Sequence, residues 1–166
     1  MINDDVIRAL LDEGELRALW KRHLKTANII QTWDEWKDKV ERAYILLIRR
    51  ASEVPYEEIV IPYGELGERI GLHPLSEWFH LKIGHIVGAC SINEYQHGRP
   101  LISALVVNGD TYQPGKGFWG LPGIPPNLRK AGAIEDVTSF KLDEERDRFW
   151  TDHLKAIDRY WKGKEH

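Results

Sequence analysis

Apolar residues recur at helical spacing through the first third of the chain. The pattern over residues 4–26 predicts a helix, in which Gly14 is a weak point. A second helix is predicted from Thr32 to about Ser52, because Thr32 and Glu35 have the spacing of a capping box. The N-terminal third is therefore expected to be helical.

The middle of the chain combines a short apolar run with two further helical patterns. Residues 58–61 predict a strand, which leads into a helix over 63–70 that ends at Gly71. Pro74 favours the first turn of a longer helix that continues to about Gln96. Its apolar stripe is Ile83, Ile86, Val87 and Cys90, and close approach of another element is expected at Gly84 and Gly88.

Strand and loop signals follow that helix. The apolar run 101–107 predicts a buried strand, and Asn108-Gly109-Asp110 is a hairpin turn signal. Residues 114–126 contain four glycines and four prolines and predict a loop. A closing helix is expected over 143–162, where the apolar positions again have helical spacing.

The order of these elements indicates an α+β fold in which helices dominate. We expect a winged-helix-like centre with flanking N- and C-terminal helices and a small β-hairpin. The chain is predicted to be one domain over residues 1–166. It divides into a helical N-terminal part (1–56), the winged-helix-like unit (57–120), and a loop with the closing helix (121–166).

Composition narrows the class of protein. The 166 residues carry a formal net charge of −3, which argues against a strongly basic nucleic-acid protein, although a basic patch can lie on an acidic chain. Cys90 is the one cysteine, which excludes an intramolecular disulfide and a multi-cysteine zinc site. The sequence shows no secretion signal and no apolar run of about 18 residues. We therefore expect a cytoplasmic protein that does not enter a membrane, and no cofactor is indicated.

A series of short motifs runs in order through residues 59–120. The motifs are Ile61-Pro62-Tyr63-Gly64-Glu65-Leu66, Gly71, Val87-Gly88 with Asn93 nearby, Val106-Val107, and Gly109, Gly115 and Gly117. In this order they resemble the DNA-binding domain of the O6-alkylguanine-DNA alkyltransferase and alkyltransferase-like family. The resemblance implies a winged-helix-like unit that binds DNA. Residues 82–119 also look like a family of uncharacterised bacterial proteins, a likeness that brings no activity with it.

The motif that carries the chemistry of the alkyltransferases is absent. Those enzymes have Pro-Cys-His-Arg before the Val-Val pair, whereas residues 100–105 contain no Cys, His or Arg. Cys90 is expected to be an inert core thiol, so alkyl transfer is excluded. The resemblance also implies that His85 lies near the place of the arginine that the family inserts into the base stack. It places Tyr63 at the tyrosine that helps to rotate a nucleotide.

A nucleic-acid-binding face is predicted on the helix over 74–96. His80, Lys82 and His85 supply it, because positions 82 and 85 are neighbours on one helical face. Tyr63 lies at its edge and Lys116 lies in a wing-like loop, which completes the predicted DNA contacts. The alternative is that these side chains form the solvated polar face of a structural helix.

Two other groups of residues are candidates for chemistry. Glu94, His97, Arg99 and Ser103 would make a small hydrolase or nuclease site if they met, although two protein ligands are too few for a closed metal site. A capped helix end is the alternative for this group.

The second group lies in the glycine-rich loop. Gly115 and Gly117 release backbone amides that can cradle phosphate, while Phe118 and Trp119 can stack on bases. The alternative is that these aromatic rings anchor the loop to the core.

Three hypotheses follow from the sequence. The leading hypothesis is a non-alkylating, winged-helix-like protein that binds DNA. The second is the small enzyme built on the four polar residues. The third is a protein-interaction module, such as a homodimer, that uses a tryptophan-rich surface.

Overall fold

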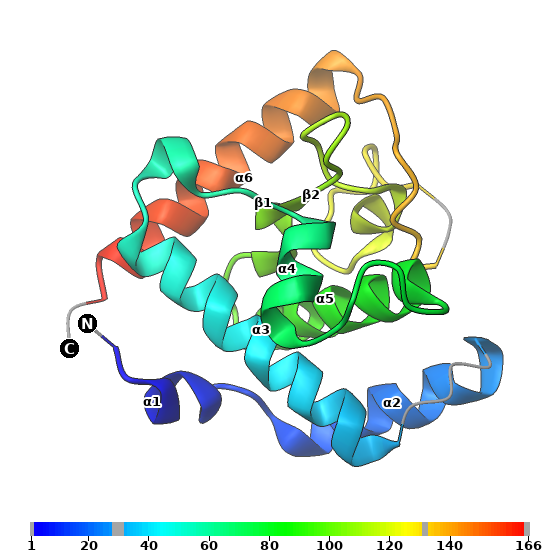
Figure 1. The fold of residues 1–166 in the computed structure, drawn as a ribbon. Helices are drawn as coiled ribbons and strands as arrows, with labels where there is room; N and C mark the ends of the chain where they lie inside the picture. Colours follow the sequence, from blue (N-terminus) through cyan, green and yellow to red (C-terminus); the bar gives the residue numbers. More distant parts are fainter. Residues whose placement is uncertain (1, 28–31, 131–132, 165–166) are drawn as a thin grey trace.

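The computed structural model describes residues 2–27, 32–130 and 133–164, and helices dominate them, as predicted (Figure 1). The helices are α1 (Asp4–Arg8), α2 (Glu13–Ala27), α3 (Trp33–Glu53), α4 (Tyr63–Ile70), α5 (Phe79–Gln96) and α6 (Glu144–Lys162). The strands are β1 (Ile61–Pro62) and β2 (Val106–Val107), and short 3-10 turns are η1 (Tyr56–Glu58), η2 (Ile102–Leu105) and η3 (Lys116–Gly120). Helix α3 crosses the molecule and packs against α1, α5 and α6 (Figure 1).

The N-terminal segment forms two helices, so the prediction of one helix over 4–26 was wrong. Gly14 lies inside α2 and is not the point of interruption. The chain breaks before α2 because Asp12 caps it, accepting a hydrogen bond of 3.1 Å from the backbone N–H of Glu15. The N–H of Asp12 itself donates to Asn93 in a distant helix. A local cap and a tertiary contact therefore meet at this helix boundary.

Two boundaries that depend on local signals were predicted correctly. The Thr32 hydroxyl accepts a hydrogen bond of 3.2 Å from the N–H of Glu35 at the start of α3. Gly71 ends α4 with φ of 84°, a left-handed conformation that glycine adopts without steric cost. Both signals lie within a few residues of the boundary that they set.

The strands are shorter than predicted, and they do not form a hairpin. β1 and β2 pair in parallel, with Ile61 opposite Val106. The predicted strand at 58–61 is mostly lost because Arg50 donates to the carbonyls of residues 58, 59 and 60 at 2.7–2.9 Å. Those carbonyls are therefore bound to a guanidinium and not to a neighbouring strand.

The predicted strand over 101–107 and the predicted hairpin are also corrected. Residues 102–105 wind into η2, and only Val106 and Val107 are extended in β2. Asn108 starts a closed turn, since its carbonyl accepts from the N–H of Tyr112 and its N–H donates to the carbonyl of Gln113. The following loop then bonds to the segment after residue 135, through Gly117 N–H to the carbonyl of Asp136. No strand returns alongside β2 within the described residues.

Helix α5 begins later than Pro74, the predicted start, and ends at Gln96 as predicted. Residues 73–78 form successive turns, in which the Ser76 hydroxyl donates to the carbonyl of His73. Trp78 then has φ of 62°, and this left-handed residue separates the turns from the helix.

Close approach to α5 is confirmed at both predicted glycines. A Cβ atom at Gly84 would lie 2.3 Å from the carbonyl oxygen of Glu135, and one at Gly88 would lie 3.0 Å from Ile134. The predicted apolar stripe of α5 is buried, including Cys90. One apolar cluster includes residues of α2, α3, α5 and α6. No helix of the described residues has both the length and the apolar character needed to span a membrane.

Candidate functional site

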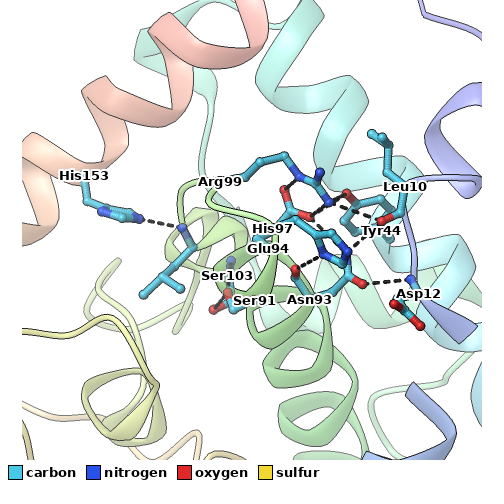
Figure 2. A network of polar contacts seen from close by, with 11 residues as sticks. Leu10, Asp12, Tyr44, Ser91, Asn93, Glu94, His97, Arg99, Ser103 and His153 are labelled. Atoms are coloured by element: carbon cyan, nitrogen blue, oxygen red, sulfur yellow. Dashed lines mark hydrogen bonds and ion pairs between the residues drawn. The ribbon is translucent and has the colours of Figure 1, made fainter. Parts of the chain in front are cut away.

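Glu94 lies at the centre of a buried polar network between α3, α5 and the segment after α5 (Figure 2). Tyr44 donates a hydrogen bond of 2.6 Å to Oε1 of Glu94. The Arg99 guanidinium donates twice, from Nε to Oε2 at 2.9 Å and from Nη2 to Oε1 at 3.0 Å. A carboxylate removed from water requires such partners, because an unpaired buried charge is strongly unfavourable.

The network extends to the junction between α1 and α2. The carbonyl of Leu10 accepts hydrogen bonds from Asn93 Nδ2 at 3.0 Å and from Arg99 Nη2 at 3.2 Å. The N–H of Asp12 donates to Asn93 Oδ1 at 2.9 Å, so the buried side-chain amide of Asn93 binds both Leu10 and Asp12. Burial, reinforced by Glu94, raises the pKa of Tyr44 far above its usual range, which keeps the phenol protonated as a donor. The network therefore joins α3 and α5 to the junction between α1 and α2.

The other two residues of the predicted enzyme site have separate partners (Figure 2). His97 is exposed, and its Nδ1 forms a hydrogen bond of 2.8 Å with the carbonyl of Asn93. Ser103 is buried, and its hydroxyl accepts a hydrogen bond of 2.6 Å from the hydroxyl of Ser91. Ser91 also accepts from the N–H of Ser103 at 2.8 Å. The four residues therefore do not converge on one reacting centre.

The glycine-rich loop is packed against the chain and is not an open cradle. A Cβ atom at Gly115 would lie 2.6 Å from Val137 Cα, and one at Gly117 would lie 2.4 Å from the carbonyl of Ile134. The N–H of Gly117 donates to the carbonyl of Asp136. An amide that is bound to a neighbouring segment is not available to bind phosphate in this conformation.

The two aromatic residues of that loop are buried, so they anchor it to the core. Phe118 and Trp119 pack edge to face at 5.1 Å between ring centroids, and Trp119 also contacts Phe149 of α6. Neither ring is exposed to stack on a base, which corrects the expectation of a ligand-binding loop. Their burial agrees with the alternative given from the sequence, in which the rings anchor the loop to the core.

Two of the five predicted nucleic-acid contacts are also buried. Tyr63 is 8% exposed, and its hydroxyl accepts a hydrogen bond of 3.3 Å from the N–H of Gly115. Burial raises the pKa of Tyr63 to about 12. His85 is 3% exposed, and its ring faces Trp36 at 5.1 Å between centroids. Most of α5 is surrounded by other elements, so these side chains do not form a surface that a DNA duplex can reach.

The other three predicted contacts lie at the surface. His80 is exposed in the first turn of α5, and Lys82 and Lys116 are partly exposed. Two apolar side chains that the sequence did not single out lie just before His80. Leu75 is 89% exposed and Trp78 is 59% exposed. The helix was predicted to start at Pro74, which would place Trp78 inside it. The left-handed backbone of Trp78 was therefore not expected.

A cavity of about 720 Å³ opens beside the same end of α5. Its walls are the first turn of α5, the turn at 108–110 and the segment 133–139. None of the four predicted enzyme residues lines this cavity. In the described part of the chain, no group of three or more His, Cys, Asp or Glu side chains is placed to hold a metal ion.

Cys90 is fully buried on α5, and burial raises the pKa of its thiol well above the usual range. An alkyl acceptor must be an accessible thiolate, and Cys90 has neither property.

No protein-family model, curated protein or solved structure matches this chain. The resemblance to the alkyltransferases therefore stays a prediction that rests on the short motifs alone.

Proposed function

We propose that this chain is a non-alkylating DNA-binding protein with a winged-helix-like unit formed by β1, α4, α5 and β2. Its contact surface is the turn between α4 and α5 together with the first turn of α5. This surface comprises Leu75, Trp78, His80 and Lys82, and we add Lys116 of η3, whose backbone N–H donates to Thr138 in the wall of the cavity that His80 also lines. The DNA contact is thus expected at the N-terminal end of α5, and not along its whole length as the sequence predicted.

The exposed Trp78 is the observation that carries the proposal. A large apolar side chain in water is unfavourable, and a left-handed backbone at a residue with a Cβ atom adds a further cost. Strained residues of this kind concentrate at functional sites. Apolar side chains at the edge of DNA-binding proteins enter between base pairs, and aromatic rings stack on unpaired bases.

The backbone around Trp78 is held in place by hydrogen bonds, which favours a preformed contact. The N–H of Leu75 donates to Nδ1 of His73 at 3.0 Å, and the N–H of Phe79 donates to the carbonyl of Ser76. The carbonyl of Trp78 accepts from the N–H of Lys82 at 2.9 Å, as the first hydrogen bond of α5. Leu75 and Trp78 are therefore presented outward without further ordering of the turn.

Positive charge at this surface is modest. Lys82 and Lys116 are the lysines of the proposed surface, and Asp136 lies close enough to Lys116 to be stabilised in its charged form. Few phosphate contacts imply weak binding with a shallow dependence on salt, because each neutralised phosphate adds to that dependence. We therefore expect stacking or wedging by Trp78 to supply much of the affinity.

Fluorescence anisotropy of a labelled random duplex and a labelled single strand, at two salt concentrations, tests the proposal. Trp78→Ala is expected to weaken binding about tenfold or more, since base stacking contributes roughly 1–3 kcal/mol. The matched control is Tyr95→Ala, because Tyr95 is an aromatic residue that is 50% exposed at the opposite end of α5. Lys82→Ala should reduce the salt dependence, whereas Lys155→Ala on α6 should not.

Absence of binding to either nucleic acid at low salt would contradict the proposal. So would equal losses from Trp78→Ala and Tyr95→Ala.

A second function is favoured by the same exposed pair. Leu75 and Trp78, three positions apart in one turn, both expose apolar surface of the kind that a protein interface buries, and the partner could be a second copy of this chain. Sedimentation of the wild type and the Trp78→Ala variant separates the two functions. Self-association that is lost in the variant, without any salt-dependent DNA binding, would replace DNA by a second copy as the partner.

A further inference from the structure

The cavity beside α5 has carboxylates on two of its walls. Asp110 lies on the turn at 108–110, and Glu135 and Asp136 lie on the facing segment. Both carboxylate oxygens of Asp110 accept from the hydroxyl of Ser139, at 3.1 and 3.0 Å, so this contact joins the two walls. His80 is the basic side chain among the described lining residues. The cavity is therefore predominantly acidic.

The charge of Asp136 is favoured by its surroundings. Burial raises its pKa, but hydrogen bonds from Thr138 and the nearby Lys116 outweigh burial and hold the pKa below its usual range. The N–H of Thr138 donates to Asp136 Oδ1 at 3.0 Å. This leaves Asp136 as an ionised acceptor at the cavity wall.

The remaining lining determines which cation fits. Leu81, Ala133 and Val137 supply apolar wall, and no three acidic or histidine side chains among the described residues are arranged to hold a metal ion. The Nδ2 atom of Asn108 is shielded from solvent and has no hydrogen-bond partner among the described residues. This donor is therefore closed off from the cavity and offers no contact to a ligand.

We propose that this cavity, in which the carboxylates of Asp110 and Asp136 share the lining with apolar side chains, binds a small organic amine. The ligand class is a protonated amine on an aromatic or aliphatic body. The volume of about 720 Å³ lies in the range of cavities that hold such molecules. The site borders the proposed DNA-contact surface and shares His80 with it, but its attraction for an amine comes from the carboxylates and does not depend on DNA binding.

Titration calorimetry with two matched probes tests the proposal. Tyramine carries the ammonium group, the apolar ring and a hydroxyl acceptor, whereas 4-ethylphenol lacks only the amine. Saturable binding of tyramine, at least tenfold tighter than that of 4-ethylphenol, is the expected result. It should weaken as salt is raised, since the attraction is electrostatic.

Variants locate the site within the protein. Asp136→Asn keeps an oxygen for the Thr138 N–H and removes the charge, so tyramine binding should weaken about tenfold. Asp110→Asn is a second variant with the same expectation. Asp147→Asn makes the same change on exposed α6 and should have no effect.

Circular dichroism confirms that each variant is folded. The proposal is overturned by equal binding of the two probes, by equal effects of the cavity and control variants, or by no saturable binding of tyramine up to its solubility limit.

Discussion

Tyr44 of α3 donates a hydrogen bond of 2.6 Å to Glu94 of α5, which lies 50 positions later in the chain. The same carboxylate accepts two hydrogen bonds from Arg99. The three side chains join the central helix to the segment that leads to β2. They hold the end of α5 opposite to the exposed turn, so the proposed contact surface projects from a fixed scaffold.

We predict that removing one member of this network destabilises the protein strongly. Arg99→Ala leaves the fully buried Glu94 carboxylate without its cation, at a cost of roughly 3–5 kcal/mol in free energy of unfolding. Tyr44→Phe removes one hydrogen bond to a charged group and should cost about 1.5–3 kcal/mol. Urea denaturation followed by circular dichroism measures both changes.

The control for this prediction is Arg148→Ala, which breaks an exposed pair with Glu144 on α6. Exposed pairs contribute little, so the unfolding midpoint should hardly change. A loss for Arg99→Ala as small as that for Arg148→Ala would show that Glu94 is not dependent on its cation.

A second prediction concerns acid stability and His153. Its Nε2 accepts a hydrogen bond of 2.8 Å from the N–H of Leu101, and burial lowers the pKa of His153 to about 4. In the unfolded chain the pKa of histidine is about 6.5, so between these values the unfolded state binds more protons. Stability should therefore fall as pH drops from about 6.5 to about 4, by at most about 3 kcal/mol, and level off below that.

His153→Gln should remove this component of the pH dependence, because glutamine keeps an acceptor for Leu101 without titrating near neutral pH. His97→Gln is the matched control, since His97 is exposed. Thermal unfolding between pH 4 and 8 compares the three proteins. Parallel pH profiles for the wild type and His153→Gln would refute the assignment.

The features that the sequence predicted depend on contacts between near neighbours. The cap at Thr32 and the left-handed Gly71 are both set within a few residues, and both were correct. The Asp12 cap at the interruption between α1 and α2 is also local, whereas the hydrogen bond from Asp12 to Asn93 spans 81 positions. Hydrophobic periodicity in residues 4–26 reveals neither contact.

The candidate surface was only partly predictable for the same reason. Lys82 and His85 are three residues apart, so their assignment to one helical face was reasonable. The sequence could not show that Trp36 of α3 covers His85. It indicated a close approach at Gly84 but not that Glu135 makes it, and it did not indicate that Trp78 adopts a left-handed conformation. Tertiary packing decides which polar residues reach the surface.

We predict opposite effects for two glycine-to-alanine substitutions. Gly84→Ala would place a methyl group 2.3 Å from the backbone oxygen of Glu135, which must then move, at a cost of about 1–3 kcal/mol. Gly14→Ala in α2 meets ordinary contact with Asp12 and should stabilise by up to about 1 kcal/mol, because alanine favours helix. Denaturation midpoints measure both, and a stabilising Gly84→Ala would mean that residues 133–138 are not packed closely on α5.

The last prediction separates the stability of the exposed turn from its proposed function. Trp78 has φ of 62°, where a residue with a Cβ atom carries a cost of roughly 1–2 kcal/mol that glycine avoids. Trp78→Gly should therefore be more stable than Trp78→Ala by about 1 kcal/mol, although both lose the indole ring. If the ring binds DNA, the two variants should lose affinity equally in anisotropy titrations.

Paired measurement of unfolding and binding distinguishes this prediction from a purely structural role. A structural Trp78 would make both variants markedly less stable than the wild type and leave DNA binding unchanged at temperatures where they remain folded. If Trp78 instead binds DNA, both variants should lose DNA affinity and keep a stability close to that of the wild type. A side chain that is 59% exposed makes few contacts that truncation would remove. The left-handed conformation would then be a cost in stability that is retained because it presents the ring outward.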